Sequence, residues 1–559
     1  MSDVDLSPDE RFPGFQPGKG SNNWAVTGAR SISGQALLAG DMHLELTLPA
    51  VWYEIHLATP SMNTRGVLIP GAPLPVEAFN ERFGWTFTNT GADQIDHYQL
   101  VVDTSRTAYR YNEKWIPFDL SIDSIAVRNG GAVIDTIRFT RFGPVMGWPE
   151  NPIAIQWTAH KRTRTLRALW KMHHAEGLEE FQQALRWWDS PMQNILYADT
   201  GGNIAIRSTG HLPIRRVGHG AGLLDGTGDA FDWVGRVPFD ELPYAANPET
   251  GFLASANQQP AGPWYPYYLG HNWYRSYRSV RNNQLLNGKP AHGVSDMMAY
   301  QADVHTVQSD MFVPMMDTLT GLSEHARVLK RLLLQWDGAA GLEQSATLVL
   351  DEYLSILEGL AWDEFDKEGV RRPRQAQLYR LLTEEPASSW LDIRDSDLMR
   401  ESASDLVRLA LEATADTMLA KYGWDQAAWR WDRHHSLLIR HLTKSRALSA
   451  LDVGPLSYPG FANTLSPAAG RVATNSASWR MIVDFSKSPP EAFGVYPGGQ
   501  SGNPFSLHYA DQVPMFTHFG YYRLTRPTRV DDLGDRHISS TLRFSPFNPP
   551  PEIQPTLDE

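Results

Sequence analysis

Residues 18–44 read GKGSNNWAVTGARSISGQALLAGDMHL, and the fold can be worked out from this stretch. Ser21 follows a Gly-Lys-Gly leader and precedes a run with strand character. A glycine before a serine removes side-chain bulk from the peptide bond between them, which would help the hydroxyl attack the preceding carbonyl. Hydrolysis of the resulting ester would leave Ser21 as a new N-terminus.

A terminal serine carries its own base. Its α-amine has an ordinary pKa of about 7.7 to 8.0, so it takes up the hydroxyl proton at neutral pH. A serine at this spacing is also typical of a turn or a helix N-cap. The residues around Ser21 therefore leave both interpretations open.

The composition excludes several classes of protein. The chain has 559 residues, 42% hydrophobic and 20% charged, which indicates a large folded core. Lys and Arg number 50 against 63 Asp and Glu, and the net charge is −13, so no nucleic acid is expected as a partner. The absence of cysteine excludes disulfides and thiolate chemistry. No run of 18 apolar residues predicts a membrane span, and the N-terminus does not resemble a signal peptide.

The order of predicted elements favours an α+β fold. Residues from about 21 to 160 are β-rich, and residues from about 166 to 188 have helical spacing. A section from about 293 to 423 is helical, strands return after about 475, and a Pro-rich tail covers about 545–559. This order lacks the regular βαβα alternation of a doubly wound parallel sheet.

Familiar catalytic motifs are missing. The sequence has no glycine-rich phosphate loop, no HExxH zinc motif and no GxSxG elbow, so nucleotide binding and α/β-hydrolase chemistry have no support.

A resemblance raises the weight of Ser21. SNNW followed by LLAGDMHL resembles the start of the catalytic β subunit in the penicillin acylase family. Seven further blocks resemble that family in the right order: PGAPLP, WTFTNTGADQID, SPMQNILYADTGGNIAIRSTGHLPIR, LASANQQP, YRSVRNNQLL, SASWRMIVDF and PGGQSGNPFSLHYADQ. The resemblance implies a four-layer αββα N-terminal-nucleophile hydrolase fold with a helical insertion, and an autocatalytically cleaved zymogen.

The resemblance also implies roles for individual residues. Ser21 would be the nucleophile, and it would hydrolyse the amide bond of a small N-acyl compound. His43 matches the histidine of the cephalosporin acylase and acyl-homoserine lactone acylase branches, where it lies near the nucleophile's amine. The backbone N–H of Thr90 and the side-chain amide of Asn257 would form the oxyanion hole. Arg278 would orient site groups, and we expect Asp484 to be the carboxylate that partners His43.

The same comparison requires no redox or organic cofactor and leaves room for a structural calcium. Asp93 and Asp96 resemble the acidic residues of that calcium site, and Ile95 would offer a carbonyl. A further aspartate expected shortly after Asn257 is missing, and hard cations need six or more oxygens. Asp93 and Asp96 are equally typical of turn residues.

The chain differs from the family in its organisation. We expect residues 1–20 to be a leader or spacer remnant and 21–559 to be a β subunit whose α subunit is separately encoded or missing. A β chain alone would expose an unusual apolar surface. The resemblance implies a periplasmic enzyme, whereas the chain taken literally, without a signal peptide, would stay in the cytoplasm.

The function therefore has alternatives. A non-catalytic or unmatured β-subunit remnant is the main one, and a carbohydrate- or peptide-binding module is weaker. The acyl and amine groups of the substrate are also open: an acyl-homoserine lactone, a β-lactam side chain and another N-acyl amine all suit this machinery, and His43 favours the aliphatic-acyl branches.

Overall fold

The computed structural model describes residues 19–271, 273–368, 370, 372–394, 400–526 and 542. The leader predicted over residues 1–20 lies outside the described residues except for Lys19 and Gly20. The Pro-rich tail predicted at about 545–559 also lies outside them.

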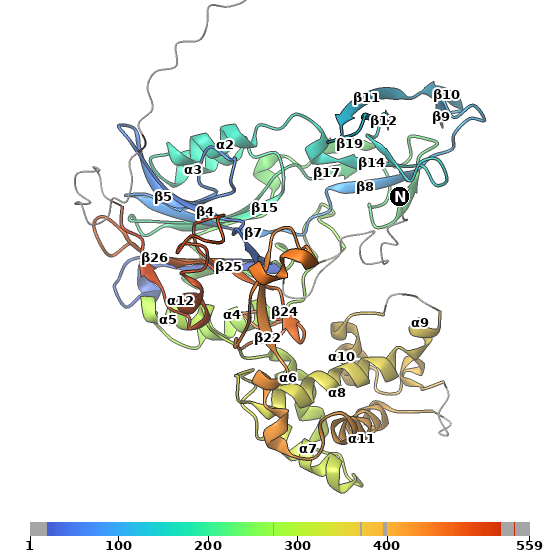
Figure 1. The fold of residues 1–559 in the computed structure, drawn as a ribbon, viewed down its shortest axis with the longest axis vertical. Coiled ribbons are helices and arrows are strands. Elements are labelled where there is room, and N and C mark those ends of the chain that lie inside the picture. The colour runs from blue at the N-terminus through green and yellow to red at the C-terminus, as the bar shows by residue number, and fades with distance from the viewer. Residues whose placement is uncertain are drawn as a thin grey trace, which may run out of the picture.

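Two antiparallel sheets face each other at the centre of the molecule (Figure 1). In spatial order, sheet 1 consists of β21 (Phe252–Ser255), β1 (Gly20–Val26), β2 (Leu37–Glu45), β25 (Asn475–Asp484), β26 (Glu491–Val495) and β27 (Tyr522–Arg523). Sheet 2 consists of β20 (Tyr244–Ala246), β16 (Ile204–Thr209), β15 (Gln193–Asp199), β7 (Phe83–Asn89), β6 (Glu77–Phe79), β5 (Met62–Leu68) and β4 (Tyr53–Thr59).

Helices cover the outer face of each sheet. In β1, Ala25 points into the core between the sheets, whereas Trp24 and Val26 point outward onto α4 (Tyr277–Asn287) and α5 (Val294–Gln301). On sheet 2, aromatic residues of β7 pack outward onto α2 (Thr165–His173) and α3 (Leu178–Leu185). The layers are therefore helix, sheet, sheet and helix, which confirms the predicted αββα fold (Figure 1).

Burial on both faces explains the sequence of the two central strands. All seven residues of β1 and the first seven of β2 are buried. A strand covered on both sides has no polar face, so ALLAG reads as a continuous apolar run rather than an alternation.

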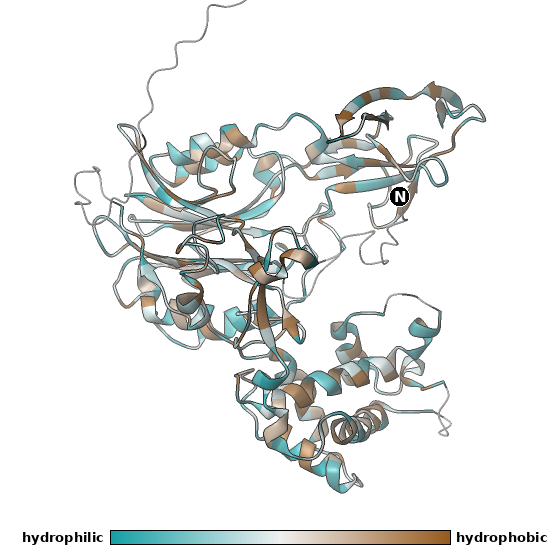
Figure 2. Ribbon diagram, in the orientation of Figure 1, coloured by the Kyte–Doolittle hydropathy of each residue, from teal (hydrophilic) through white to brown (hydrophobic). Residues whose placement is uncertain are grey.

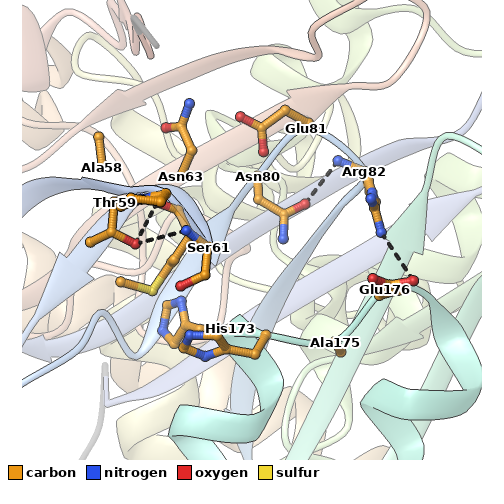
Figure 3. Close-up of a pocket in the computed structure, with 13 residues that line it drawn as sticks. Ala58, Thr59, Ser61, Asn63, Asn80, Glu81, Arg82, His173, Ala175 and Glu176 are labelled. Atoms are coloured by element: carbon orange, nitrogen blue, oxygen red, sulfur yellow. Dashed lines mark hydrogen bonds and ion pairs between the residues drawn. The ribbon is translucent and has the colours of Figure 1, made fainter. Parts of the chain in front are cut away.

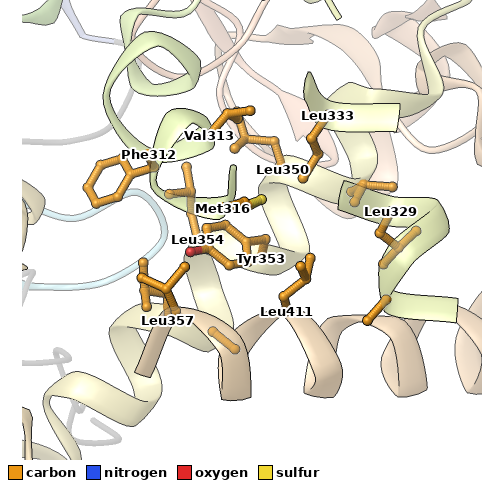
Figure 4. Close-up of a cluster of buried hydrophobic side chains, with 14 of the residues drawn as sticks. Phe312, Val313, Met316, Leu329, Leu333, Leu350, Tyr353, Leu354, Leu357 and Leu411 are labelled. Atoms are coloured by element: carbon orange, nitrogen blue, oxygen red, sulfur yellow. The ribbon is translucent and has the colours of Figure 1, made fainter. Parts of the chain in front are cut away.

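A helical body follows the sandwich and lies below it in Figure 1. Beyond α5 it contains α6 (Val307–Phe312), α7 (Glu324–Leu334), α8 (Ser345–Ala361), α9 (Asp363–Lys367), α10 (Gln375–Glu384) and α11 (Ala403–Tyr422). Its core is separate from that of the sandwich: Tyr353 and Leu357 of α8 pack against Leu411 of α11 (Figure 4). These helices lie within the section from about 293 to 423 that was predicted to be helical.

A second β region extends from the sandwich beyond β7. Its sheet contains β13 (Val145–Met146), β14 (Ile153–Trp157), β8 (Ile95–Gln99) and β18 (Leu223–Asp225). Two ribbons accompany it, β9 (Ala108–Tyr111) with β10 (Lys114–Pro117) and β11 (Asp119–Ala126) with β12 (Ala132–Phe139). Ile122 and Ile134 of the second ribbon are 65% and 60% exposed, so apolar side chains are accessible to solvent on it. Figure 2 shows brown, hydrophobic positions interspersed with hydrophilic ones along β11.

Shorter elements complete the chain. They are β3 (Thr47–Leu48), β17 (Pro213–Arg215), β19 (Trp233–Arg236), β22 (Ser436–His441), β23 (Val453–Leu456), β24 (Val472–Ala473) and α12 (Val513–Thr517). Within the described part of the chain, no helix has the length and apolar character needed to cross a membrane.

Candidate active site

Ser21 lies at the start of β1, on the face that points between the two sheets. It pairs with Met42 of β2, whose side chain belongs to the inter-sheet core. The backbone N–H of Ser21 donates to Asn257 Oδ1 at 2.6 Å, and its hydroxyl donates to the carbonyl oxygen of Gly20 at 2.6 Å. Ser21 is only 4% exposed, so with Gly20 attached the hydroxyl lies against the peptide bond that precedes it.

Glycine is required before this serine. Gly20 has φ +149°, a backbone conformation that other residues rarely adopt. A Cβ there would lie 2.7 Å from Asn257 Oδ1 and closer still to Arg278 Nη2. The absence of side-chain bulk at residue 20, inferred from the sequence, therefore has a definite steric reason.

Arg278 and Asn257 come together around Ser21. From α4, Arg278 donates to Ser21 O and Asn22 Oδ1 at 2.7 Å each and to Asn257 Oδ1 at 2.9 Å. All three acceptors are uncharged oxygens, and burial lowers the pKa of Arg278 to about 10, although Asp41 acts in the opposite direction. The result is a buried cation beside the peptide bond of Ser21.

Asn257 links this cluster to the turn that contains Thr90. Its φ of +66° lies in the left-handed region, which asparagine tolerates better than most residues. Its Nδ2 donates to Asn89 O at 2.9 Å, on the peptide unit that contains the N–H of Thr90. Thr90 itself is 1% exposed, and Gly91 follows with φ +69°. Asn257 therefore links Ser21 to the carbonyl side of the 89–90 peptide, and the N–H of Thr90, which is trans to that carbonyl, points away from the Asn257 amide.

His43 lies on the other face of sheet 1. Its Nε2 is 2.8 Å from Asp41 Oδ2 and 3.2 Å from Asn22 Nδ2, and both His43 and Asp41 are fully buried. Burial lowers the pKa of His43, with Arg278 acting in the same direction and Asp41 opposing them, so the ring is neutral at neutral pH. His43 approaches the Ser21 group through Asn22, which also accepts from Arg278.

The expected pairing of His43 with Asp484 is wrong. His43 lies opposite Ala477 in β25, whereas Asp484 lies opposite Leu37, at the other end of the strand pair. Asp484 instead accepts from the backbone N–H of Ser486 at 2.8 Å. Strand register places these two side chains apart, and Asp41 is the carboxylate on His43.

Sequence reasoning missed Asp41 and Asn22, although the sequence contained a signal. Asp41 and His43 are two positions apart in one strand, and residues i and i+2 of a strand share a face. The antiparallel pairing then puts Asn22 directly opposite Asp41. Recognising both strands would have been enough to bring these side chains together.

The residues proposed for calcium are arranged differently. Both carboxylate oxygens of Asp96 accept N–H donors from Arg215, and Trp233 Nε1 donates to Asp96 Oδ2 at 2.6 Å. Asp93 Oδ1 lies 3.4 Å from Arg215 Nη2. Within the described residues, no group of three or more His, Cys, Asp or Glu side chains could hold a metal ion. Donors that point at these oxygens do not fit a divalent cation, which needs the lone pairs turned toward it.

A surface pocket lies away from this cluster. It has a volume of about 370 Å³ and is lined by the β4–β5 turn, residues 80–82 and residues 173–176 (Figure 3). None of its lining residues belongs to the group around Ser21.

Comparisons with known proteins agree with this arrangement. The family model described as penicillin amidase matches residues 3–529. An acyl-homoserine lactone acylase QuiP of Pseudomonas aeruginosa is 28% identical to this chain. The alignment covers 93% of this chain and 68% of that protein. A penicillin acylase 2 proenzyme of Pseudomonas sp. strain SE83 is 27% identical to this chain. That alignment covers 89% of this chain and 65% of the proenzyme.

A solved structure supports the fold independently. The penicillin G acylase from Alcaligenes faecalis superimposes with a TM-score of 0.75 at 21% identity, covering 94% of this chain and all of that one. The chain spans about two thirds of the length of the curated relatives that it matches. Because the family model covers nearly the whole sequence, the chain belongs to the penicillin amidase family.

Proposed function

We propose that the chain hydrolyses the amide bond of a small N-acyl compound, with Ser21 as the nucleophile once the Gly20–Ser21 bond has been cut. The observation that carries the proposal is the placement of Ser21 between Asn257 and Arg278, with its hydroxyl on the carbonyl of Gly20. Membership of the penicillin amidase family supports the reaction class.

The first step of the proposal is processing. Ser21 Oγ attacks the carbonyl carbon of Gly20, the C–N bond breaks, and the hydroxyl proton passes to the departing amine. The product is an ester between Gly20 and Ser21. Water hydrolyses this ester, which releases the leader as a carboxylic acid and leaves Ser21 with a free amine and a free hydroxyl.

The second step is turnover. The free amine accepts the proton of Ser21 Oγ as the oxygen attacks the acyl carbon of the substrate, and then passes it to the leaving amine. One N–H of the Asn257 amide is used by Asn89 O, and its second N–H is available to the oxyanion. In this proposal the N–H of Thr90 joins it after the 89–90 peptide turns over, since the N–H and the carbonyl of a trans peptide point in opposite directions. Water then hydrolyses the acyl-ester and restores Ser21.

In this proposal His43 acts through Asn22. The Nε2–H of neutral His43 donates to Asp41 Oδ2, and Asn22 Nδ2 donates to the same oxygen at 3.4 Å. The carboxylate thus holds the Asn22 side chain, whose Oδ1 accepts from Arg278. His43 and Asp41 are therefore positioning residues for the cation next to Ser21.

Acyl-homoserine lactones are the first substrates to test. Relatives with 26–28% identity are named acyl-homoserine lactone acylases, while those named penicillin acylase 2 proenzyme and penicillin G acylase are 27% and 24% identical. A hydrolysis assay should compare an aliphatic acyl-homoserine lactone with a penicillin, and we expect the lactone to give the higher kcat/KM.

The deciding experiment is the intact mass and N-terminal sequence of the purified protein. A chain that begins Ser-Asn-Asn-Trp and releases free acid from the acyl substrate supports the proposal. Ser21→Ala should keep the leader and lose at least about 10³-fold in turnover, because the nucleophile is gone. The exposed Ser33 provides a matched control, and Ser33→Ala should behave as wild type.

A leader that stays attached would support the alternative of an unmatured β-subunit remnant. Since about a third of the relatives' own length lies outside the matched region, the same assay should be repeated with an added α subunit. We propose such a subunit as the partner of this chain, and processing that appears only on its addition would identify it as required for maturation.

A further inference from the structure

A second buried cluster lies at the start of β8, next to the turn that contains Thr90. Arg215, the last residue of β17, lies at its centre. It donates two parallel hydrogen bonds to Asp96, from Nε to Oδ2 and from Nη2 to Oδ1, both 2.8 Å long. Nη2 also lies 3.3 Å from Asp93 O and 3.4 Å from Asp93 Oδ1. The side chains of Arg215 and Asp96 are 2% and 0% exposed, so this ion pair is screened from water.

The remaining oxygens of the two carboxylates are also occupied. Trp233 Nε1 donates to Asp96 Oδ2, and the hydroxyl of Tyr268 donates to Asp93 Oδ2 at 3.3 Å. His271 Nδ1 lies 3.7 Å from the same oxygen. Each carboxylate therefore faces hydrogen-bond donors, and the charge of the guanidinium is shared between the two acids.

The cluster has no room for a further group. A Cβ on Gly220 would lie 2.8 Å from Arg215 Nη2 and 2.9 Å from Asp93 Oδ2, and closer still to Asp96 Oδ1. Backbone packs directly onto the ion pair at this point. A hydrated divalent ion would have to displace either this backbone or the guanidinium.

Several segments meet at the cluster. Asp96 belongs to β8, Arg215 to β17 and Trp233 to β19, and the backbone N–H of Asp93 donates to Leu269 O at 2.8 Å. Asp93 follows Thr90 by three residues, and within this turn the N–H of Ala92 donates to Thr90 Oγ1 at 3.2 Å.

We propose that Arg215 is a built-in cation that cross-links these segments in place of a divalent metal ion, and that it positions the turn whose Thr90 N–H receives the oxyanion. The second half of this statement rests on the function proposed above; the first half does not. The chain thus needs no bound calcium to hold this turn.

Thermal unfolding tests the first half without any substrate. The wild-type chain should unfold at the same midpoint, within about 1 °C, in millimolar calcium chloride and in excess EDTA. Arg215→Met should lower the midpoint by about 5 °C or more, because two buried carboxylates lose their partner.

Arg216 provides a matched control on the next residue. It is half exposed and lies 3.6 Å from the exposed Asp229, so Arg216→Met should shift the midpoint by about 1 °C or less. A wild-type midpoint that rises with calcium and falls with EDTA would overturn the proposal. So would an Arg215→Met protein as stable as Arg216→Met.

If Arg215→Met does not fold, the double variant Asp96→Asn/Arg215→Met decides the matter. Removing both charges should recover stability relative to Arg215→Met, because the uncompensated acid is gone. A double variant that is no more stable than Arg215→Met would contradict the ion pair as the source of the effect.

Kinetics tests the second half. Arg215→Lys keeps the positive charge but loses the bidentate hydrogen bond to Asp96. We therefore expect kcat to fall about tenfold while KM stays within about twofold. An unchanged kcat in a folded, destabilised Arg215→Lys protein would reduce Arg215 to a purely structural role. A wild-type chain without turnover would instead count against the proposed function and would leave the unfolding result on Arg215 standing.

Discussion

Two buried arginines organise two polar clusters, and they do so in opposite ways. Arg278 donates to three uncharged oxygens around Ser21, and burial lowers its pKa. Arg215 donates to the carboxylate of Asp96 and to the backbone carbonyl of Asp93, and it forms an ion pair with the Asp93 carboxylate. Burial alone would lower its pKa as well, but the hydrogen bonds and charge of Asp96, with that of Asp93, outweigh burial and raise it.

The two arginines differ in how far neighbouring groups neutralise the charge of the guanidinium. The charge of Arg215 is neutralised by its partners, so it stabilises structure. Asp41 and Tyr274 raise the pKa of Arg278, but burial outweighs them. None of its three hydrogen-bond acceptors is charged, so a positive potential remains beside Ser21. Such a potential stabilises negative charge that develops in a transition state. Charge compensation thus separates a structural arginine from one suited to catalysis.

The largest effect on processing and turnover is expected from a substitution at Gly20, because the side chains of Asn257 and Arg278 pack directly against its backbone. Gly20→Val places a branched side chain against Asn257 Oδ1 and Arg278 Nη2, so the Gly20–Ser21 bond should stay intact and turnover should be lost. Intact mass and an amidase assay measure both. Gly131→Val is the control, since a Cβ there meets nothing within 4 Å, and it should be processed normally. Normal processing of Gly20→Val would show that the cluster is looser than described.

Asn257→Ala should follow in size. It removes the proposed oxyanion donor and the acceptor for Ser21 N–H, and kcat/KM should fall about 10²- to 10³-fold. Steady-state kinetics on processed protein measures this. Asn247 is a useful control because it also has a positive φ, of 45°, but lies outside the cluster. A change of less than about threefold would place the oxyanion hole elsewhere.

Arg278 itself tests the comparison most directly. Arg278→Lys keeps a positive charge near Ser21 but loses the guanidinium group that donates to three oxygens, so kcat should fall about tenfold. Arg278→Met removes the charge and should lower kcat a further tenfold or so. If the two variants have equal kcat values, the charge of Arg278 has no part in turnover and the contrast with Arg215 fails.

The smallest expected effect is on the unfolding midpoint, when the pH is lowered and His43 becomes protonated. The pKa of buried His43 is lowered in the folded chain, so its contribution to stability is present above the unfolded value of about 6.5 and is lost as the pH falls below it. Protonation would add a second cation near Arg278. His43→Gln should therefore reduce the fall in unfolding midpoint between pH 7.5 and 5.5 by about 1 to 2 °C. His508 is 72% exposed, and His508→Gln should leave the fall unchanged.

Much of the fold could be predicted because it depends on local pattern. The order of strands and helices and the start of the first strand near Ser21 are visible in the sequence and in its family resemblance. The helical spacing between about 293 and 423 reflects amphipathic faces that bury one common core. These features need no knowledge of which strand lies beside which.

The parts that failed depend on register. Asp41 contacts His43 within β2, whereas the position of Asp484 is decided by pairing between β2 and β25, which are separated by more than 400 residues. That pairing puts Ala477 opposite His43 and Asp484 opposite Leu37, so only a different register would bring Asp484 to His43. Arg215 was missed for a similar reason: its contact with Asp96 spans 119 residues, and nothing near Arg215 in the sequence points to a carboxylate.

The group around Ser21 is assembled from distant parts of the chain, and this sets an order in time. The contacts of Ser21 with Asn257 and Arg278 span 236 and 257 residues. A ribosome delivers Ser21 long before either partner, and the cluster cannot exist until α4 has been made and has docked on sheet 1. Under the proposed function, chemistry at Ser21 waits for translation and folding, and a nascent chain that stops before residue 278 should keep its leader.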